Sequence, residues 1–193
     1  MPESAAPLLR IERGQVEEGR QRGHLAAVDA RGTLVASKGD PSRMTYFRSC
    51  AKPFQAIAAL RTGIVDRFGL TAEHVAIICA SHNGEPRHVA VVRDLLAHIG
   101  TNESALQCGA HWPYDEAAAS VVRREMVEPL AVFNNCSGKH SGMLAAARVL
   151  RAPLESYLEP SHPVQQRIRQ VVEEFTGCAS TAVRAASASE VTS

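Results

Sequence analysis

The sequence lacks the features that mark membrane, secreted or nucleic-acid-binding proteins. No apolar run approaches the roughly 20 residues that span a bilayer, and residues 1–25 lack the apolar stretch of a signal peptide. Aromatic residues make up only 5% and the formal net charge is +1, so electrostatics gives no reason to expect a nucleic-acid or membrane partner. The five cysteines are widely spaced without a Cys-x-x-Cys pair, which argues against a zinc finger or a disulfide framework. A cytoplasmic protein with free thiols is expected.

What is present is typical of an ordinary globular chain of 193 residues, with 45% hydrophobic and 21% charged residues. Short apolar runs separated by polar and glycine turns predict strands over 8–11, 24–28 and 33–36, with a hairpin turn at 29–32. A continuous apolar run predicts a buried strand over 75–79. Helical spacing and Pro or Gly end signals predict helices over 49–62, 86–99, 115–127, 141–150 and 161–175.

The composition changes near the C-terminus. From Cys178 to Ser193 most residues are Ala, Ser or Thr, and nothing larger than Val is available to anchor a core. We therefore expect a folded portion over residues 1–177 and a disordered or out-of-frame tail over residues 178–193.

Three polar segments carry the reactive side chains, and the first contains the pattern Ser-x-x-Lys at Ser49 and Lys52. In one helical turn these residues share a face. Ser49 would then lie at the positive end of the helix dipole. A serine hydroxyl needs a neighbouring base to act as a nucleophile, and a semi-buried lysine can lose its proton and serve as that base. The alternative is an N-cap serine followed by a solvated lysine, because chance matches at this spacing are frequent.

The second segment, residues 79–88, follows the predicted strand and precedes a predicted helix. It concentrates serine and histidine in one loop, and loops held by rigid elements often carry catalysis. The alternative is an ordinary turn with a Glu-Pro helix start.

The third segment, residues 134–142, is predicted to be a polar loop that enters a helix at Met143. Its Cys136, Lys139 and His140 are suited to bind a metal, hold a substrate carboxylate or carry protons. The alternative is an anion-binding or capping loop at a helix N-terminus.

These segments occur in a fixed order together with a fourth, Gln107-Cys-Gly-Ala-His-Trp-Pro113. The strings are Arg48-Ser-Cys-Ala-Lys-Pro-Phe-Gln55, Ala80-Ser-His-Asn-Gly-Glu-Pro-Arg-His88 and Asn134-Asn-Cys-Ser-Gly-Lys-His-Ser-Gly-Met143. Together they resemble the bacterial asparaginase II family of the rhizobial type, over roughly residues 8–177. The resemblance implies an α+β fold like that of the serine β-lactamases, with helices packed around an antiparallel sheet. It also implies hydrolysis of L-asparagine to L-aspartate and ammonia.

The resemblance assigns roles to individual residues. Ser49 would be the nucleophile and Lys52 its base, with Ser81 as the second serine of a linked Ser/Lys proton network. Zinc is the implied cofactor, held in part by Cys136 and Lys139. The residues expected to line the substrate site are Arg48, Asn83 and His140. The expected partners are the small-molecule substrate and a second copy of the chain in a homodimer.

The family chain is longer than this one, and its second half supplies a further lysine and a further zinc-binding cysteine. Only an incomplete N-terminal part of the fold is therefore expected here, as after a frameshift or truncation. Three hypotheses follow: an asparaginase-type amidohydrolase, a truncated inactive fragment, and a β-lactam-recognising acyl-serine protein. The first is favoured for ancestry. The second is favoured for turnover by this chain, and asparagine versus glutamine preference stays open.

Overall fold

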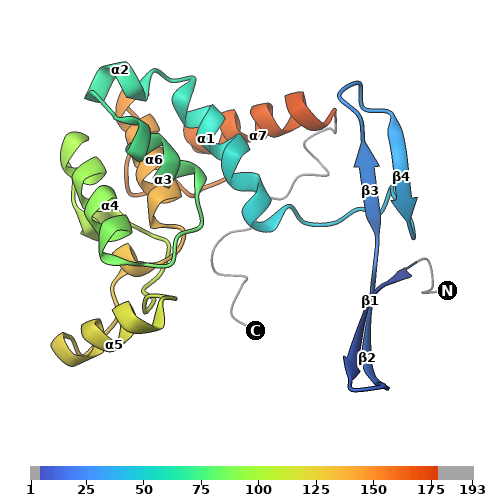
Figure 1. Ribbon diagram of the computed structural model, residues 1–193. Coiled ribbons are helices and arrows are strands. Elements are labelled where there is room, and N and C mark those ends of the chain that lie inside the picture. The colour runs from blue at the N-terminus through green and yellow to red at the C-terminus, as the bar shows by residue number, and fades with distance from the viewer. Residues whose placement is uncertain (1–4, 178–193) are drawn as a thin grey trace. The chain divides into compact units, whose positions relative to one another are not determined.

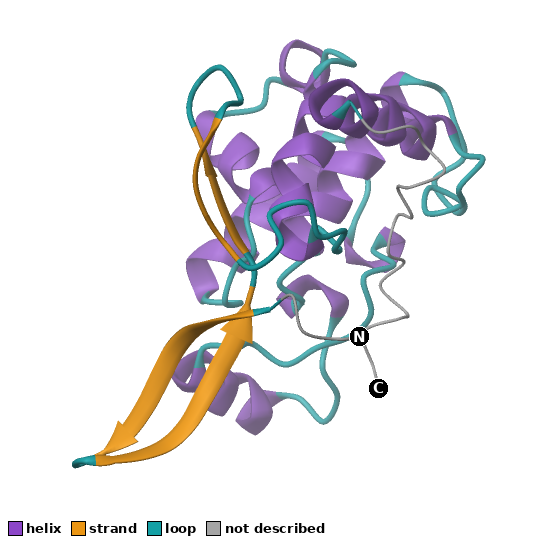
Figure 2. Cartoon of the chain, turned by 90° about the vertical axis from the view of Figure 1, so that its right-hand side faces the viewer, coloured by secondary structure: helices purple, strands orange, loops and turns teal. Residues whose placement is uncertain are grey.

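The computed structural model describes residues 5–177, so the tail predicted over 178–193 lies outside the described residues. Contacts divide the chain into two compact units, Met1–Tyr46 and Phe47–Ser193, an internal boundary that the sequence did not predict. Every strand that the structure describes belongs to the first unit, and the helices belong to the second (Figure 2). Mixed helices and small antiparallel sheets are compatible with the predicted α+β class. The β-lactamase-like arrangement stays a prediction.

The first unit consists of two antiparallel hairpins. β1 (Ala6–Arg13) pairs with β2 (Val16–Gly23), and β3 (Leu25–Val28) pairs with β4 (Leu34–Lys38). The predicted turn between β3 and β4 is confirmed. The Asp29 carboxylate accepts hydrogen bonds from the N–H groups of Arg31 at 2.8 Å and Thr33 at 2.9 Å, and Gly32 takes a φ of 81°. β2 was not predicted because its charged sequence has almost no apolar residues.

The second unit is a helical bundle with α6 (Ser137–Val149) at its centre (Figure 1). Most side chains of α6 are buried, because α1 (Lys52–Leu60), α3 (Ala72–Cys79) and α4 (Pro86–His98) pack against it. α7 (Pro163–Thr176) packs on α1 and α6. The remaining elements are α2 (Ile64–Phe68), α5 (Glu116–Glu125) and three short 3₁₀ helices, η1 (Arg48–Ala51), η2 (Glu103–Ala105) and η3 (Ala131–Phe133). Within residues 5–177, no helix is both long and apolar enough to cross a membrane.

The prediction of a buried strand over Val75–Cys79 is wrong, because these residues form the second half of α3. Thr71 begins this helix with a capping box: its hydroxyl accepts from the His74 N–H, and its own N–H donates to His74 Nδ1 at 3.0 Å. His74, Ile77 and Ile78 then share one buried face at helical spacing. A short apolar run alone does not distinguish a buried strand from a buried helix.

The prediction that residues 134–142 form a polar loop is also wrong, because α6 begins at Ser137 rather than near Met143. The Asn134 side chain accepts a hydrogen bond from the Cys136 N–H at 2.9 Å, and the Ser137 N–H donates to the Asn134 carbonyl at 2.9 Å. The chain therefore turns into the helix three residues after Asn134. The other predicted helices are confirmed as α4, α5, α7 and, after one turn of 3₁₀ helix, α1.

Two glycines explain why so polar a helix start lies in the core. A Cβ at Gly138 would lie 2.2 Å from the carbonyl oxygen of Ile77, and one at Gly142 would lie 2.6 Å from Cγ2 of Ile78. These glycines let the backbones of α6 and α3 approach more closely than any other residue allows. The same approach brings the end of α3 to the beginning of α6.

Gly138→Ala should therefore destabilise the second unit even though alanine is the better helix former. The new methyl group meets backbone, which cannot rotate away, so a loss of about 2 to 3 kcal/mol in the free energy of unfolding is expected. Urea unfolding followed by circular dichroism measures it. Gly19→Ala is the matched control, because its Cβ would meet only ordinary contacts at 3.7 Å or more. Equal stability of Gly138→Ala and the wild type would contradict the close crossing.

Candidate active site

The 3₁₀ turn η1, just before α1, places Ser49 and Lys52 at the two ends of one hydrogen-bonded turn. The Lys52 N–H donates to the Ser49 carbonyl across η1, and Pro53 follows inside α1. Ser49 is exposed, whereas Lys52 is only 2% exposed. Arg48, immediately before Ser49, has a φ of 51°, a conformation that a non-glycine residue adopts only at a cost of about 1 to 3 kcal/mol. Strain of this kind is found often at functional sites.

The Lys52 amine is the centre of the contacts among the predicted residues. Its Nζ donates to the Ser81 hydroxyl oxygen and, at 3.3 Å, to the backbone carbonyl of Asn135. Three segments far apart in the sequence therefore meet at one ammonium group. The structure brings Lys52 and Ser81 together as predicted, but within residues 5–177 it gives the Ser49 side chain no hydrogen bond to Lys52.

Burial lowers the pKa of Lys52 below its ordinary value, because an ammonium ion loses hydration when it is desolvated. Cys136 opposes this change through its charge and a hydrogen bond, and the positive charge of Lys139 adds to it. Cys136 and Lys139 thus lie within electrostatic reach of Lys52, although one precedes α6 and the other lies in its first turn. A lowered pKa increases the neutral fraction of the amine, which is the form that can accept a proton.

The loop between α3 and α4, residues 80–85, is fixed by His82, which sequence analysis placed in the loop without giving it a role. His82 Nδ1 accepts from the Gly84 N–H at 3.1 Å, and its Nε2 lies 2.8 Å from the Ser137 hydroxyl. Since the Ser137 hydroxyl donates to the Val132 carbonyl, His82 must be the donor at Nε2 and is therefore neutral. Burial, His88 and Lys52 lower the pKa of His82 to about 4.

The same loop depends on Gly84. Its φ is 75°, and a Cβ there would meet Pro113 Cα at 2.9 Å and the Phe133 carbonyl oxygen at 3.0 Å. Glycine is therefore required both by the backbone conformation and by the space. The loop is held on one side by α6 and on the other by this contact, and it presents Ser81 to Lys52.

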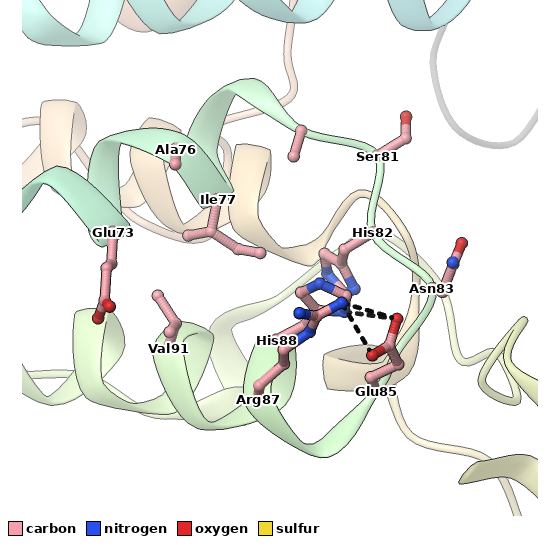
Figure 3. A pocket seen from close by; sticks show the side chains of 11 residues that line it. Glu73, Ala76, Ile77, Ser81, His82, Asn83, Glu85, Arg87, His88 and Val91 are labelled. Atoms are coloured by element: carbon pink, nitrogen blue, oxygen red, sulfur yellow. Dashed lines mark hydrogen bonds and ion pairs between the residues drawn. The ribbon is translucent and has the colours of Figure 1, made fainter. Parts of the chain in front are cut away.

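An open depression of about 470 Å³ lies beside the loop, between α3 and α4. In Figure 3, Ser81 and Asn83 point away from the group formed by His82, Glu85 and His88. Asn83 is exposed, and its backbone carbonyl accepts from the Asp115 N–H at 3.0 Å. Its predicted role in substrate binding stays a prediction, as does that of the exposed Arg48.

His140, also predicted to line the substrate site, is 1% exposed. The Tyr157 hydroxyl accepts from the Gln107 N–H at 2.8 Å and also lies within hydrogen-bond distance of His140 Nδ1, 2.6 Å away. The other ring nitrogen, His140 Nε2, has no hydrogen-bond partner within the described residues. Burial, followed by the charges of Lys139 and Lys52, lowers the pKa of His140 well below its ordinary value. No sequence motif pointed to Tyr157, whose part in the site comes from the fold alone.

The implied zinc ligands Cys136 and Lys139 do not form a closed site among the described residues. No group of three His, Cys, Asp or Glu ligand atoms includes Cys136 within residues 5–177. Burial raises the pKa of Cys108 to about 12, and its thiol donates to the Ala131 carbonyl, so it is a poor additional ligand. Zinc sites need three or four protein ligands. The donors described here do not meet that need, and we derive no chemical step through a metal.

Comparison with known protein families supports the resemblance that the motifs indicate. A family model described as L-asparaginase II matches residues 9–187, which is most of the chain. The chain belongs to the L-asparaginase II family. The match continues beyond Gly177, where the resemblance was expected to end. A search of curated proteins gives no match.

The neutral state of His82 makes stability depend on pH. Above pH 6.5 its ring is uncharged in both the folded and the unfolded chain. Between pH 6.5 and about 4 only the unfolded chain takes up the proton, so the free energy of unfolding falls as the pH falls. At pH 5 the expected loss from His82 is about 2 kcal/mol, since one pKa unit corresponds to roughly 1.4 kcal/mol. His140 acts in the same direction.

Urea unfolding at pH 7.5 and pH 5 measures this loss. His82→Gln should reduce the difference between the two pH values, whereas the matched change His111→Gln at a half-buried ring should leave it as in the wild type. A difference that His82→Gln does not reduce would show that His82 is not held neutral by its surroundings.

Proposed function

We propose that this chain hydrolyses the side-chain amide of L-asparagine, with Ser49 as nucleophile and Lys52 as its base. Membership of the L-asparaginase II family supports the general amidohydrolase function. The observation that carries the finer proposal is the buried Lys52 amine with its lowered pKa, which lies three residues from Ser49 and is hydrogen-bonded to Ser81. A lysine in this setting is the kind of base that an acyl-serine mechanism requires.

The hydrogen bonds of Lys52 are compatible with the role of base. A neutral amine has two N–H bonds and one lone pair. The Ser81 oxygen and the Asn135 carbonyl would accept the two N–H bonds of the neutral amine, and its lone pair would take the proton of the Ser49 hydroxyl once that hydroxyl has turned toward it. Ser81 would hold the Lys52 amine in place, and as an acceptor it would favour the protonated form that follows the proton transfer.

The Ser49 oxygen adds to the amide carbon while its proton passes to Lys52. Backbone N–H groups beside Ser49 that are not already bonded within the turn would stabilise the oxyanion. The proton on Lys52 then passes to the leaving nitrogen, ammonia departs, and an aspartyl ester on Ser49 remains. Water, deprotonated by Lys52, cleaves the ester and regenerates Ser49, so one asparagine and one water give aspartate and ammonia.

Zinc bound at Cys136 and Lys139 stays a prediction from the family, as do substrate contacts from Arg48, Asn83 and His140. Assembly as a homodimer also stays a prediction.

Ser49→Ala should lower the rate of ammonia release from L-asparagine by at least about a thousandfold, because it removes the oxygen proposed to form the ester. The assay couples ammonia to NADH oxidation, with L-glutamine as a second substrate. Ser120→Ala, at an exposed position of α5, is the matched control and should retain wild-type turnover.

Full turnover by Ser49→Ala would refute the assignment of the nucleophile. No ammonia release by the wild-type chain would refute turnover itself and favour the inactive-fragment hypothesis. Labelling of Ser49 by a fluorescent penicillin, without amidase activity, would favour the β-lactam-recognising hypothesis.

A further inference from the structure

A second group of polar side chains lies on the α3–α4 hairpin, away from the loop that carries Ser81. It consists of His74 in α3 and of Asp94 and His98 in α4. Their ligand atoms all lie within 4.8 Å of one another. His74 is buried, whereas Asp94 and His98 have side chains that are 61% and 36% exposed. The two α4 side chains of this group are therefore open to solvent, whereas its α3 member, His74, is buried.

Hydrogen bonds fix which nitrogen carries the proton in the neutral form of both rings. The Thr71 N–H donates to His74 Nδ1, so in the neutral ring Nε2 carries the proton and donates to Asp94 Oδ2 at 2.9 Å. The opposite holds for His98. Its Nδ1 lies 3.0 Å from the Phe68 carbonyl, which can only accept, so the proton is on Nδ1 and the Nε2 lone pair is free.

The free lone pair of His98 faces the carboxylate of Asp94, four residues earlier on the same face of α4. His98 Nε2 lies 3.6 Å from Asp94 Oδ2. Two ligands at about 2.0 to 2.2 Å from one tetrahedral zinc ion are roughly 3.4 Å apart, so this separation suits a shared ion. Both ligands also have the outer hydrogen bond that metal ligands usually show: Phe68 O on the His98 ring, and His74 Nε2–H on the Asp94 carboxylate.

We propose that Asp94 and His98 bind a divalent transition-metal ion such as Ni²⁺ or Co²⁺ reversibly on the surface of α4, with His74 positioning Asp94. With two protein ligands this is an exchangeable site, unlike a resident zinc site with three or four. Imidazole nitrogen and carboxylate oxygen are a donor pair that these ions accept. Water completes the coordination, because the site is open on the solvent side. The ion ties the last turns of α4 to α3 through His74 and stiffens the hairpin whose loop carries Ser81. The site shares no residue with the proposed active site.

His74 is a positioning residue here and not a ligand. As a ligand through Nε2 it would have to move its proton to Nδ1, where that proton would face the N–H of Thr71. That arrangement would break the capping box at the start of α3. The rings of His74 and His98 pack edge to face, with centroids 5.1 Å apart, which holds both against the shared carboxylate.

Calorimetric titration of the full chain with Ni²⁺ tests the proposal. Asp94→Asn and His98→Gln should each weaken binding at least about tenfold, because each removes one of two protein ligands. Asp66→Asn, which removes an exposed carboxylate from α2, is the matched control and should bind as the wild type does. Binding at cysteine thiols is common to all four proteins and cancels in the comparison.

His74→Gln should weaken binding about tenfold, the usual effect of losing an outer partner. Added to Asp94→Asn, it should cause no further loss, since its effect passes through that carboxylate. A purely structural role would weaken Ni²⁺ binding equally in both backgrounds. Wild-type affinity in both Asp94→Asn and His98→Gln would overturn the site, and equal losses from His74→Gln in the two backgrounds would overturn the positioning role.

Discussion

Burial of the Lys52 amine is the constraint on which the arrangement of the site depends. A cation so far removed from water is unfavourable unless its hydrogen-bonding groups find partners or its proton is lost. Here the partners come from the loop after α3 and from the residue before Cys136, so the amine joins α1, α3 and α6 at one point. The burial that accompanies these contacts lowers the pKa of the amine, whereas hydrogen-bond acceptors favour its protonated form.

For α1, α3 and α6 to meet at this amine, the backbone of α6 has to approach that of α3 closely. Glycine residues make this approach possible. Gly138 and Gly142 let α6 cross α3 against Ile77 and Ile78, and Gly84 lets the following loop pass Pro113 and Phe133. His82 then bonds to Ser137 and fixes the loop to α6. In a member of the L-asparaginase II family, the small residues of the motifs are thus as much a part of the site as its reactive groups.

Sequence reasoning singled out three polar segments that the structure brings together at Lys52, but it misjudged the local structure of two of them. The apolar run before Ser81 was assigned to a strand because five residues carry too little periodicity to reveal a helix. The segment around Lys139 was assigned to a loop because its glycines and polar residues lack apolar spacing. They are buried through tertiary packing, which local propensity does not encode. The contact between Lys52 and Asn135 and the hydrogen bond between Tyr157 and His140 join distant segments, so no local pattern pointed to them.

The most direct test of the account is a titration of the Lys52 amine by NMR, with lysine labelled at Cε and Nζ and with the Lys52→Met variant assigning the signal. Burial of the amine predicts a Lys52 pKa below the ordinary value of 10.5. The signal should also respond to Ser81→Ala, which removes one of the two hydrogen-bond acceptors. A Lys52 signal that titrates together with the other lysines would contradict the claim that burial prepares this residue to act as a base.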